Sequence, residues 1–528
     1  MTMDRSSGAG GGTASMGYDV ANRKDLDKLH TKAVGLIGVL FLTVTGAAPI
    51  SAMLFNVPVA VGFGNGIGTP AAFLVATIIL LVFSVGYAAM AGKVTAVGGF
   101  YSFISHGLGR ELGMGFGFGS VFAYSMFEVS LAGGFAYFGN LDLNQWFGIN
   151  VPWPILALIM IGGIAILTYF DVKISTAILG VALVAEVAIL VIFAIGVFSQ
   201  AGANIQVDAI NPLNALRGFD AHEKLQAGAA GIGLFFAFWS WVGFEMAPNY
   251  AEESRDPKRI VPLSMYISVV GLGIFYTLVS WAALSGYAKL DDAIGQAQNN
   301  SAEFFFQPAA QFIGGWVKLV MSILILTGSF ACGMAFHNTA ARYFYSLGRE
   351  RLLPTSLGKT HPTYRSPHVA SFTQSAIAAL CIIIYALKEG YSDPNGQAYL
   401  GVYGLFAVLG VVIILAAQAL VSLAIIFYFR THHPEEHHWW KTLVAPLIAL
   451  VTQAYVIYLC LSNMAFLGSG YAFADWIVPI DLIVLAIGIV GAFWIKTKDP
   501  VKYDQIGRLI YEGLPDGTMA DAERASRR

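Results

Sequence analysis

Long apolar runs follow one another along most of the chain, with short polar segments between them. About twelve such runs cover 33–60, 70–92, 114–139, 153–170, 174–198, 228–250, 262–285, 311–346, 368–388, 399–429, 440–463 and 473–495. A helix of about 20 apolar residues crosses the roughly 30 Å of hydrocarbon in a bilayer. The pattern therefore predicts an all-α integral membrane protein with about twelve transmembrane helices.

Two of these runs carry helix-breaking residues in the middle of the predicted span. The first contains Gly46 and Pro49, and the sixth contains Gly243 and Pro248. Proline lacks the N–H that a continuing helix uses. Broken helices five spans apart are the expected sign of a five-plus-five inverted repeat with a binding site near the bilayer midplane. The alternative is a pair of structural kinks, because glycine and proline are common in membrane helices.

The predicted organisation has four parts. They are a cytoplasmic, disordered N-terminal tail (1–32), a ten-helix core (33–429) made of two repeats (33–198 and 228–429), two additional helices (440–495), and a cytoplasmic C-terminal tail (496–528). The protein is predicted to be a homodimer if the two additional helices serve in self-association, and a monomer if they do not. The first thirty residues are polar and offer no cleavable signal sequence. Lysine and arginine gather in alternate loops, and the positive-inside rule then puts both termini on the cytoplasmic side of the cytoplasmic membrane.

Composition excludes several functions. With 56% hydrophobic and 12% charged residues, the chain has too much apolar surface for a water-soluble protein. A net charge of -2 gives no reason to expect a nucleic-acid partner. Cys332, Cys381 and Cys460 lie in apolar runs without paired spacing, which argues against a disulfide framework or a metal site. No phosphate loop or nucleophile elbow is present, so we expect neither an enzyme nor a cofactor.

Three stretches resemble signatures of the amino acid-polyamine-organocation transporter superfamily. They are Ala96-Val-Gly-Gly-Phe-Tyr101 with Gly107-Leu-Gly-Arg-Glu-Leu-Gly113, then Phe238-Trp-Ser-Trp-Val-Gly-Phe-Glu245 with Ala251-Glu-Glu-Ser-Arg-Asp-Pro-Lys-Arg-Ile-Val-Pro262, and Asn338-Thr-Ala-Ala-Arg342 with Gly348-Arg-Glu-Arg-Leu-Leu-Pro354. The resemblance spans roughly residues 30 to 465. It implies a secondary transporter that works by alternating access.

The resemblance also implies a substrate site at the two broken helices. Backbone amides there would receive a substrate carboxylate around Thr45, Gly46, Ala47 and Ala48, and carbonyls would receive its ammonium around Phe238, Trp239 and Ser240. The dipoles of half-helices that end inside a membrane suit both charges. Trp239 matches a gating aromatic position in the family. For Trp239 and Trp241, the alternative to a pocket or gate role is ordinary aromatic packing.

Three glutamates lie well inside predicted spans, where an ionised carboxylate costs roughly 2.5 kcal/mol or more. Glu245 matches a family position that is linked to the substrate path and to gating. Glu186 departs from the family, since several sodium-independent members carry a lysine near this place. A carboxylate there is predicted to bind a proton, or to hold a cation near Thr327 and Ser329. The alternative is a protonated glutamate that hydrogen bonds between helices.

Glu128 has no matching family motif. Either it faces a vestibule and favours cationic substrates, or it is a structural hydrogen-bond partner. Two interpretations are also open for His337. A histidine titrates near neutral pH, but a single histidine on a membrane helix is commonly a packing residue.

Together these observations predict a secondary active transporter of amino acids, polyamines or related amines, coupled to a gradient of H⁺ or Na⁺. The alternative is a sensor with the transporter fold that binds such a ligand without moving it. The Gly46-Ala-Ala-Pro49 stretch departs from the Gly-Ser-Gly loop of many amino acid permeases, which leaves room for amines without a carboxylate.

Overall fold

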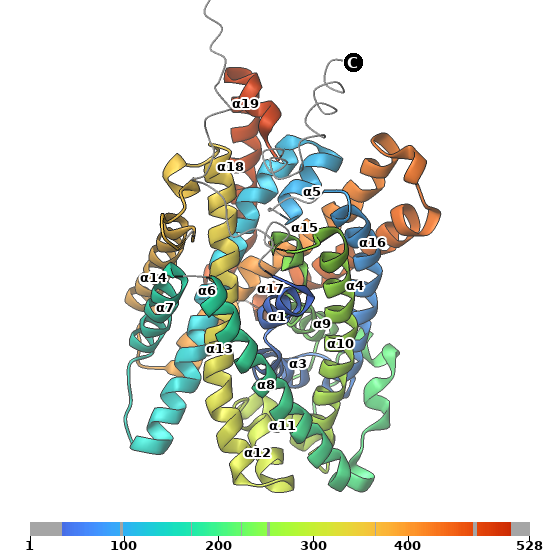
Figure 1. Cartoon of the computed structure of the whole chain (residues 1–528). Coiled ribbons are helices and arrows are strands. Elements are labelled where there is room, and N and C mark those ends of the chain that lie inside the picture. Colours follow the sequence, from blue (N-terminus) through green and yellow to red (C-terminus); the bar gives the residue numbers. More distant parts are fainter. Residues whose placement is uncertain are drawn as a thin grey trace, which may run out of the picture.

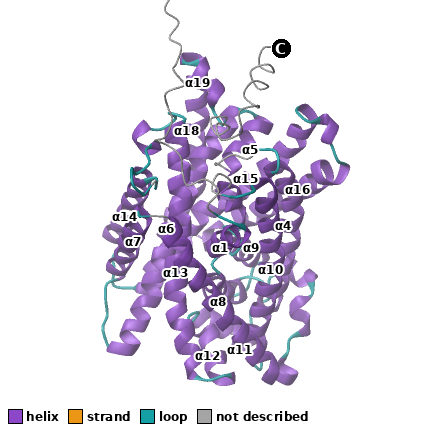
Figure 2. Cartoon of the chain, in the orientation of Figure 1, coloured by secondary structure: helices purple, strands orange, loops and turns teal. Residues whose placement is uncertain are grey.

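Helices make up most of the computed structural model (Figure 2), which describes residues 34–94, 99–170, 172–222, 224–250, 254–364, 366–467 and 472–507. Within these ranges the only β pairing is an isolated bridge between Val34 and Ser254. The predicted N-terminal tail and the end of the predicted C-terminal tail lie outside the described residues.

Eleven helical segments of the described chain are long and apolar enough to cross a membrane, and Trp153–Tyr169 is a shorter apolar helix. Together they correspond one to one with the predicted spans. The helices that form them are α1 (Leu36–Ala47), α2 (Pro49–Ser51), α3 (Val57–Phe63), α4 (Thr69–Ala91), α6 (Arg110–Phe147), α7 (Trp153–Tyr169), α8 (Val172–Ala201), α9 (Ala230–Trp239), α10 (Pro257–Ser285), α13 (Gly315–Arg349), α14 (His368–Glu389), α15 (Phe406–Thr431), α16 (Ala445–Ser462) and α18 (Ile477–Lys498).

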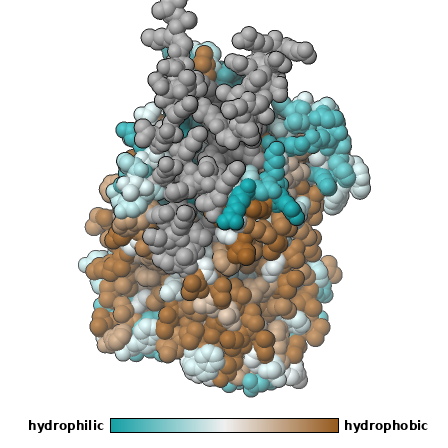
Figure 3. All heavy atoms as spheres, in the orientation of Figure 1, coloured by the Kyte–Doolittle hydropathy of each residue, from teal (hydrophilic) through white to brown (hydrophobic). Residues whose placement is uncertain are grey.

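Shorter helices join the spans or lie at their ends. They are α5 (Gly99–Leu108), α11 (Leu290–Asn299), α12 (Glu303–Phe312), α17 (Met464–Leu467) and α19 (Pro500–Gln505). Side chains on the visible face form a broad apolar band, with hydrophilic ones gathered toward the end that carries α19 (Figure 3). A bilayer-spanning bundle needs this distribution, because lipid replaces water around its middle.

The interrupted helices lie inside the bundle. Figure 1 shows α1 and α9 between α4 and α10 on one side and α6 and α13 on the other; α1 contacts α10 and α13, and α9 contacts α4. The last long helix, α18, packs along α6, while α16 packs on α15 and α4. Gly488 of α18 permits this close approach, because a Cβ there would lie 2.7 Å from the Gly115 Cα on α6.

Candidate functional site

The first helix breaks at Ala48, within the predicted Gly46–Pro49 stretch. α1 ends at Ala47, and Ala48 takes a left-handed conformation with φ 42° and ψ 75°. Pro49 then begins α2, and the path continues through a π-helix (Ala52–Asn56) into α3. A non-glycine residue in this region costs roughly 1–2 kcal/mol. The surrounding packing therefore holds a locally unfavourable turn.

The second break lies directly against the first. α9 ends at Trp239, a turn follows, and a 3₁₀-helix begins at Phe244. Gly243 has φ 124°, and a Cβ there would lie 2.6 Å from the backbone N of Ala47. Glycine is therefore required for the two interrupted backbones to touch.

A small cavity of about 20 Å³ lies between the two breaks. Five predicted site residues line it: Gly46, Ala47, Ala48, Trp239 and Ser240. Thr45, Phe238, Glu245 and Trp241 are buried but do not line it. A volume of this size holds about one water molecule. The cavity is thus closed in this structure, and a ligand larger than a water molecule can enter only after the breaks move apart.

Polar residues absent from the predicted site tie the cavity wall together. The Asn56 amide donates to the Ser240 hydroxyl at 2.8 Å, and the Tyr403 hydroxyl donates to the Asn56 amide oxygen at 2.5 Å. The Trp239 indole N–H in turn donates to the Tyr403 hydroxyl at 2.8 Å. Asn56 is the one amide side chain in the first apolar run, a signal that was available in the sequence. Nothing in the sequence singles out Tyr403.

The structure corrects the predicted carboxylate contacts. Thr45, Gly46 and Ala47 form the last turn of α1, and the C-terminal end of a helix presents carbonyls rather than amides. The Ala48 N–H donates to the carbonyls of Val44 and Thr45, both at 3.1 Å. Amide donors at this break belong instead to the start of α2.

Other side chains take the carbonyls at the end of α1. The Tyr276 hydroxyl donates to the Ala47 carbonyl at 2.7 Å, and the Cys332 thiol donates to the Gly46 carbonyl at 3.3 Å. At the second break, the Phe238 and Trp239 carbonyls accept the N–H groups of Trp241 and Val242 at 3.0 and 3.1 Å. Each carbonyl has a second lone pair, and those of the cavity-lining residues Gly46, Ala47 and Trp239 are placed to accept a further donor.

Glu186 of α8 reaches the start of α2. Its Oε2 lies 3.4 Å from the Ile50 N–H, and a Cβ on Gly328 of α13 would lie 2.8 Å from its Oε1. Gly328 thus makes room for a buried carboxyl where α2, α8 and α13 meet. Ser51 follows Ile50 and Ser329 follows Gly328, and the hydroxyls of these two serines lie 3.4 Å apart. The predicted pairing of Glu186 with Ser329 stays a prediction.

Thr327 does not join this group. Its side chain is exposed, and its hydroxyl donates to the Leu324 carbonyl of its own helix at 3.2 Å. Residues two apart on a helix point about 200° away from each other. Because Ser329 faces Ser51, Thr327 has to face outward, and the prediction that both border one cation is corrected.

Glu245 braces the second break from within. Its Oε1 accepts the Tyr124 hydroxyl and its Oε2 accepts the Gly243 N–H, both at 2.9 Å. The Tyr87 hydroxyl donates to its backbone carbonyl at 3.2 Å. The Glu245 side chain therefore stabilises the turn that contacts α1, although Glu245 does not itself line the cavity.

The two tryptophans differ in position. Trp239 lines the cavity and packs against two rings, Phe127 at a centroid distance of 4.7 Å and Phe336 at 6.1 Å. Trp241 packs edge-on against Phe244 and Tyr276, away from the cavity. The structure thus fits a pocket role for Trp239 and a packing role for Trp241.

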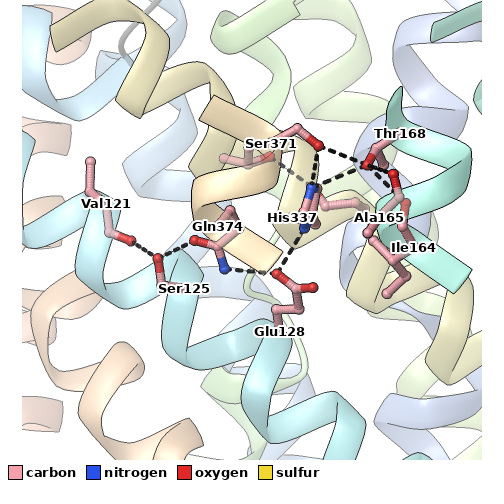
Figure 4. A network of polar contacts seen from close by, with 11 residues as sticks. Val121, Ser125, Glu128, Ile164, Ala165, Thr168, His337, Ser371 and Gln374 are labelled. Atoms are coloured by element: carbon pink, nitrogen blue, oxygen red, sulfur yellow. Dashed lines mark hydrogen bonds and ion pairs between the residues drawn. The ribbon is translucent and has the colours of Figure 1, made fainter. Parts of the chain in front are cut away.

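Glu128 faces other helices of the bundle. Its Oε2 accepts the Gln374 amide at 2.7 Å and lies 3.0 Å from His337 Nδ1 (Figure 4). Neither Glu128 nor His337 lines the cavity, and both side chains are fully buried. This is the hydrogen-bonded arrangement, and the vestibule interpretation does not describe the structure.

The first and third sequence motifs meet at one end of the bundle, next to Asn249, which lies between the two parts of the second motif. A Cβ on Gly99, which has φ 39°, would lie 3.0 Å from the Asn249 amide oxygen and 3.1 Å from the Tyr343 hydroxyl. The Tyr101 hydroxyl donates to the buried carboxyl of Glu350. Burial raises the pKa of Glu350 to about 7. The motif residues 96–98 and 251–253 lie outside the described part of the chain.

One exposed cluster of described residues, His433, Glu435 and Glu436, brings three potential metal ligands together. Glu436 already pairs with Lys93 at 2.5 Å, and exposed acidic groups of this kind are common without a metal.

Curated relatives match parts of this chain. They include a branched-chain amino acid permease of Bacillus subtilis (27% identity, 30% of this chain and 32% of the relative), a glutamate/serine transporter of the same organism (24%, 29% and 28%) and a low-affinity putrescine importer of Escherichia coli (26%, 27% and 31%). The matched segments thus span about a third of the length of each of these relatives.

A family model described as amino acid permease matches residues 34–500, which is most of the chain and includes both helix breaks, the cavity and all three motifs. The chain therefore belongs to the amino acid permease family, within the amino acid-polyamine-organocation superfamily.

Proposed function

We propose that this protein is a secondary active transporter that carries amino acids or related amines across the cytoplasmic membrane by alternating access. The observation that carries the proposal is the contact between two interrupted helices around a closed cavity. Backbone groups freed by a helix break inside a membrane bind polar ligands without requiring a charged side chain. Opening toward either side would expose the same groups in turn.

An ammonium group is the feature that fits the cavity best. None of the described residues that line it carries a charged side chain, and the polar ones include Asn56, Ser240 and Tyr403. The carbonyl end of α1 is the negative end of a helix dipole, and the amide end of α2 is a positive one. A substrate ammonium suits the first, and a carboxylate, where present, suits the second. Branched-chain amino acids, glutamate, serine and putrescine, named for the relatives, all carry an ammonium.

Glu186 is the proposed site of coupling to H⁺ or Na⁺. Its carboxyl touches the start of α2 beside Gly328 and close to Ser51 and Ser329. A neutral, protonated side chain or a carboxylate that holds a cation stabilises this three-helix contact, whereas an isolated carboxylate destabilises it. Occupancy by the coupling ion would then set how easily the first break moves.

We also propose that both termini are cytoplasmic and that the protein is a monomer or a homodimer. The alternation of lysine- and arginine-rich loops supports the orientation.

The test is uptake by the full-length chain in liposomes, with radiolabelled L-leucine, L-glutamate, L-serine and putrescine as probes. A pH gradient and a Na⁺ gradient are imposed in separate experiments, and counterflow is measured without either. We expect saturable counterflow of at least one probe and its accumulation under one gradient. Protein-free liposomes and the outward-facing Thr327→Val variant are the controls. Specific binding of a probe without flux in any arm would overturn the transport proposal and favour a sensor.

A further inference from the structure

The Glu128–His337 pair lies directly behind the aromatic wall of the cavity. Phe127 of α6 and Phe336 of α13 pack on the Trp239 indole and on each other, with 5.0 Å between their centroids. Glu128 and His337 are the next residues on the same two helices. A change at the pair therefore acts on the two helix segments that hold Trp239.

Four helices contribute to the pair's surroundings. Gln374 and Ser371 come from α14, and Thr168 comes from the end of α7 (Figure 4). Glu128 and His337 are 0% exposed, so water does not solvate their charge. Deep in a membrane protein, a titratable pair of this kind is costly and is expected to have a function.

Gln374 and His337 both lie against the same oxygen of the Glu128 carboxyl group. The Gln374 NH₂ donates to Glu128 Oε2 at 2.7 Å, and the Ser125 hydroxyl lies within hydrogen-bonding distance of both the Gln374 amide oxygen, at 2.6 Å, and the Val121 carbonyl, at 2.7 Å. Glu128 Oε2 thus receives Gln374 and faces His337 Nδ1, while its Oε1 has no hydrogen-bond partner among the described residues. A proton on Oε1 would lack an acceptor. An added proton therefore has to be held between Oε2 and the imidazole.

The hydroxyl groups beyond His337 can complete the hydrogen bonding of the pair both with and without one extra proton. Ser371 Oγ lies 2.8 Å from His337 Nε2 and 2.9 Å from Thr168 Oγ1, and Thr168 can donate to the Ile164 carbonyl at 2.8 Å. With the extra proton, Nε2–H donates to Ser371, Ser371 to Thr168, and Thr168 to Ile164. Without it, the Ser371 hydroxyl rotates and donates to Nε2. Each hydrogen has an acceptor in both states, because hydroxyls rotate to suit their neighbours.

The charge of the pair differs between these states. With one extra proton, Glu128 and His337 are together neutral, whether as an ion pair or as two neutral groups. Without the extra proton, the pair carries one negative charge, and the apolar interior of the bundle disfavours a buried charge. Other titratable or charged groups on the packed helices are engaged elsewhere: Tyr124 with Glu245, Cys332 with Gly46, Arg342 with the Tyr250 ring, and Tyr169 and His368 with His361.

Further imidazole and hydroxyl groups lie at the end of the bundle where α13 ends and α14 begins. Thr168 is followed by the exposed Tyr169, whose hydroxyl lies 3.1 Å from His361 Nε2 in the connecting loop. His368, one turn before Ser371 on α14, packs edge-on against His361 at 5.3 Å. This second group of imidazole and hydroxyl side chains is thus next to the Ser371–Thr168 hydrogen bond along both helices.

We propose that Glu128 and His337 form a proton-binding site that is reached through Ser371 and Thr168 and that couples proton occupancy to the position of Trp239. The proposal rests on the transport function proposed above, and it assigns a second ionisable site, separate from Glu186. Proton uptake neutralises the α6–α13 contact behind Phe127 and Phe336, and the aromatic wall then closes on the substrate. Proton release toward the His361 end weakens that contact and lets the wall open.

Infrared difference titration of the full-length chain in lipid tests the site without any substrate. As the pH is varied, the wild type should show imidazole bands that the His337→Gln variant lacks. The Ser371→Ala variant, which keeps the pair but interrupts the hydroxyl chain, should keep these bands at a shifted midpoint. Thr373→Val is the matched control, because Thr373 lies two residues away and bonds only within its own helix at 2.8 Å.

A transport arm then separates coupling from folding. In His337→Gln liposomes, accumulation driven by a pH gradient should fall about tenfold or more, while counterflow of the same probe persists but no longer depends on pH. Absence of a titrating imidazole, or wild-type accumulation by His337→Gln, would overturn the proposal. Because the infrared readout needs no substrate, its result stands even where no probe is transported, which would instead overturn the transport function.

Discussion

The two helix breaks touch each other, but a glutamate stabilises each of them in a different way. Glu245 belongs to its own break and accepts the Gly243 N–H at 2.9 Å, with Tyr124 as a second donor. Glu186 comes from another helix and meets Ile50 at a longer 3.4 Å. The second break is therefore braced locally, whereas the first depends on the position of α8.

This difference indicates which break is free to respond to an ion. A local brace with two well-aligned hydrogen bonds to a carboxylate contributes more than a single long one. A contact supplied by another helix, in turn, transmits any movement of that helix. The comparison assigns the structural task to Glu245 and the coupling task to Glu186, and the following changes test that assignment.

Gly243→Ala should have the largest effect. A Cβ there would lie 2.6 Å from the Ala47 N, and φ 124° disfavours any residue with a side chain. Overpacking of this kind against backbone costs roughly 1–3 kcal/mol or more, so we expect a lower unfolding temperature and no measurable uptake. Gly271→Ala is the matched control, because a Cβ there meets nothing within 4 Å. Uptake by Gly243→Ala at the wild-type rate would show that the breaks separate enough to need no close contact.

Glu245→Gln should rank next. A glutamine can accept only one of the two donors, so its NH₂ would face either the Gly243 N–H, which cannot accept, or the Tyr124 hydroxyl, which would have to reorient to accept. Losing a hydrogen bond to a charged group costs about 1.5–3 kcal/mol, which corresponds to a drop in uptake of about tenfold to a hundredfold. Tyr124→Phe removes one donor without creating a mismatch and should lose less. Wild-type uptake by Glu245→Gln would remove the residue from the proposed site.

Glu186→Gln should change the coupling more than the binding. Its single contact to the first break is long, so the thermal stability should shift little. Accumulation driven by the coupling gradient should fall about fivefold or more, while counterflow persists. Ser329→Ala is expected to weaken the response to a cation, and the outward-facing Thr327→Val should not. Gradient-driven accumulation equal to wild type in Glu186→Gln would place the coupling elsewhere.

Local sequence signals predicted most of the fold and part of the site. Apolar run length gave all twelve spans, because a bilayer requires about 20 apolar residues whatever the rest of the fold does. Gly46, Pro49 and Gly243 likewise predicted the breaks, since these residues act on their own backbone. The direction in which a helical side chain points was harder to predict, as the outward-facing Thr327 shows. This direction depends on the rotation and tilt of the helix rather than on residue type.

Contacts between distant segments carried no local signal. The Tyr403 hydroxyl reaches Asn56 across more than three hundred positions of sequence, and Glu128 meets His337 from another helix. One sequence without an alignment records no such pairings. The carboxylate contacts were misplaced for a different reason: the break falls after Ala47, so the Thr45–Ala47 segment ends a helix instead of beginning one.

Ala48→Gly should have the smallest effect, and its sign is diagnostic. Glycine takes φ 42° without the cost of roughly 1–2 kcal/mol that a side chain adds, but it loses about 0.5–1 kcal/mol through greater freedom when unfolded. The net change should be a slight rise in unfolding temperature. Ala47→Gly, one residue earlier and still within α1, gains no relief and should lower it. Opposite shifts would establish that the first break stores strain at Ala48. Equal shifts would show that the turn is relaxed and that the first break stores no strain at Ala48.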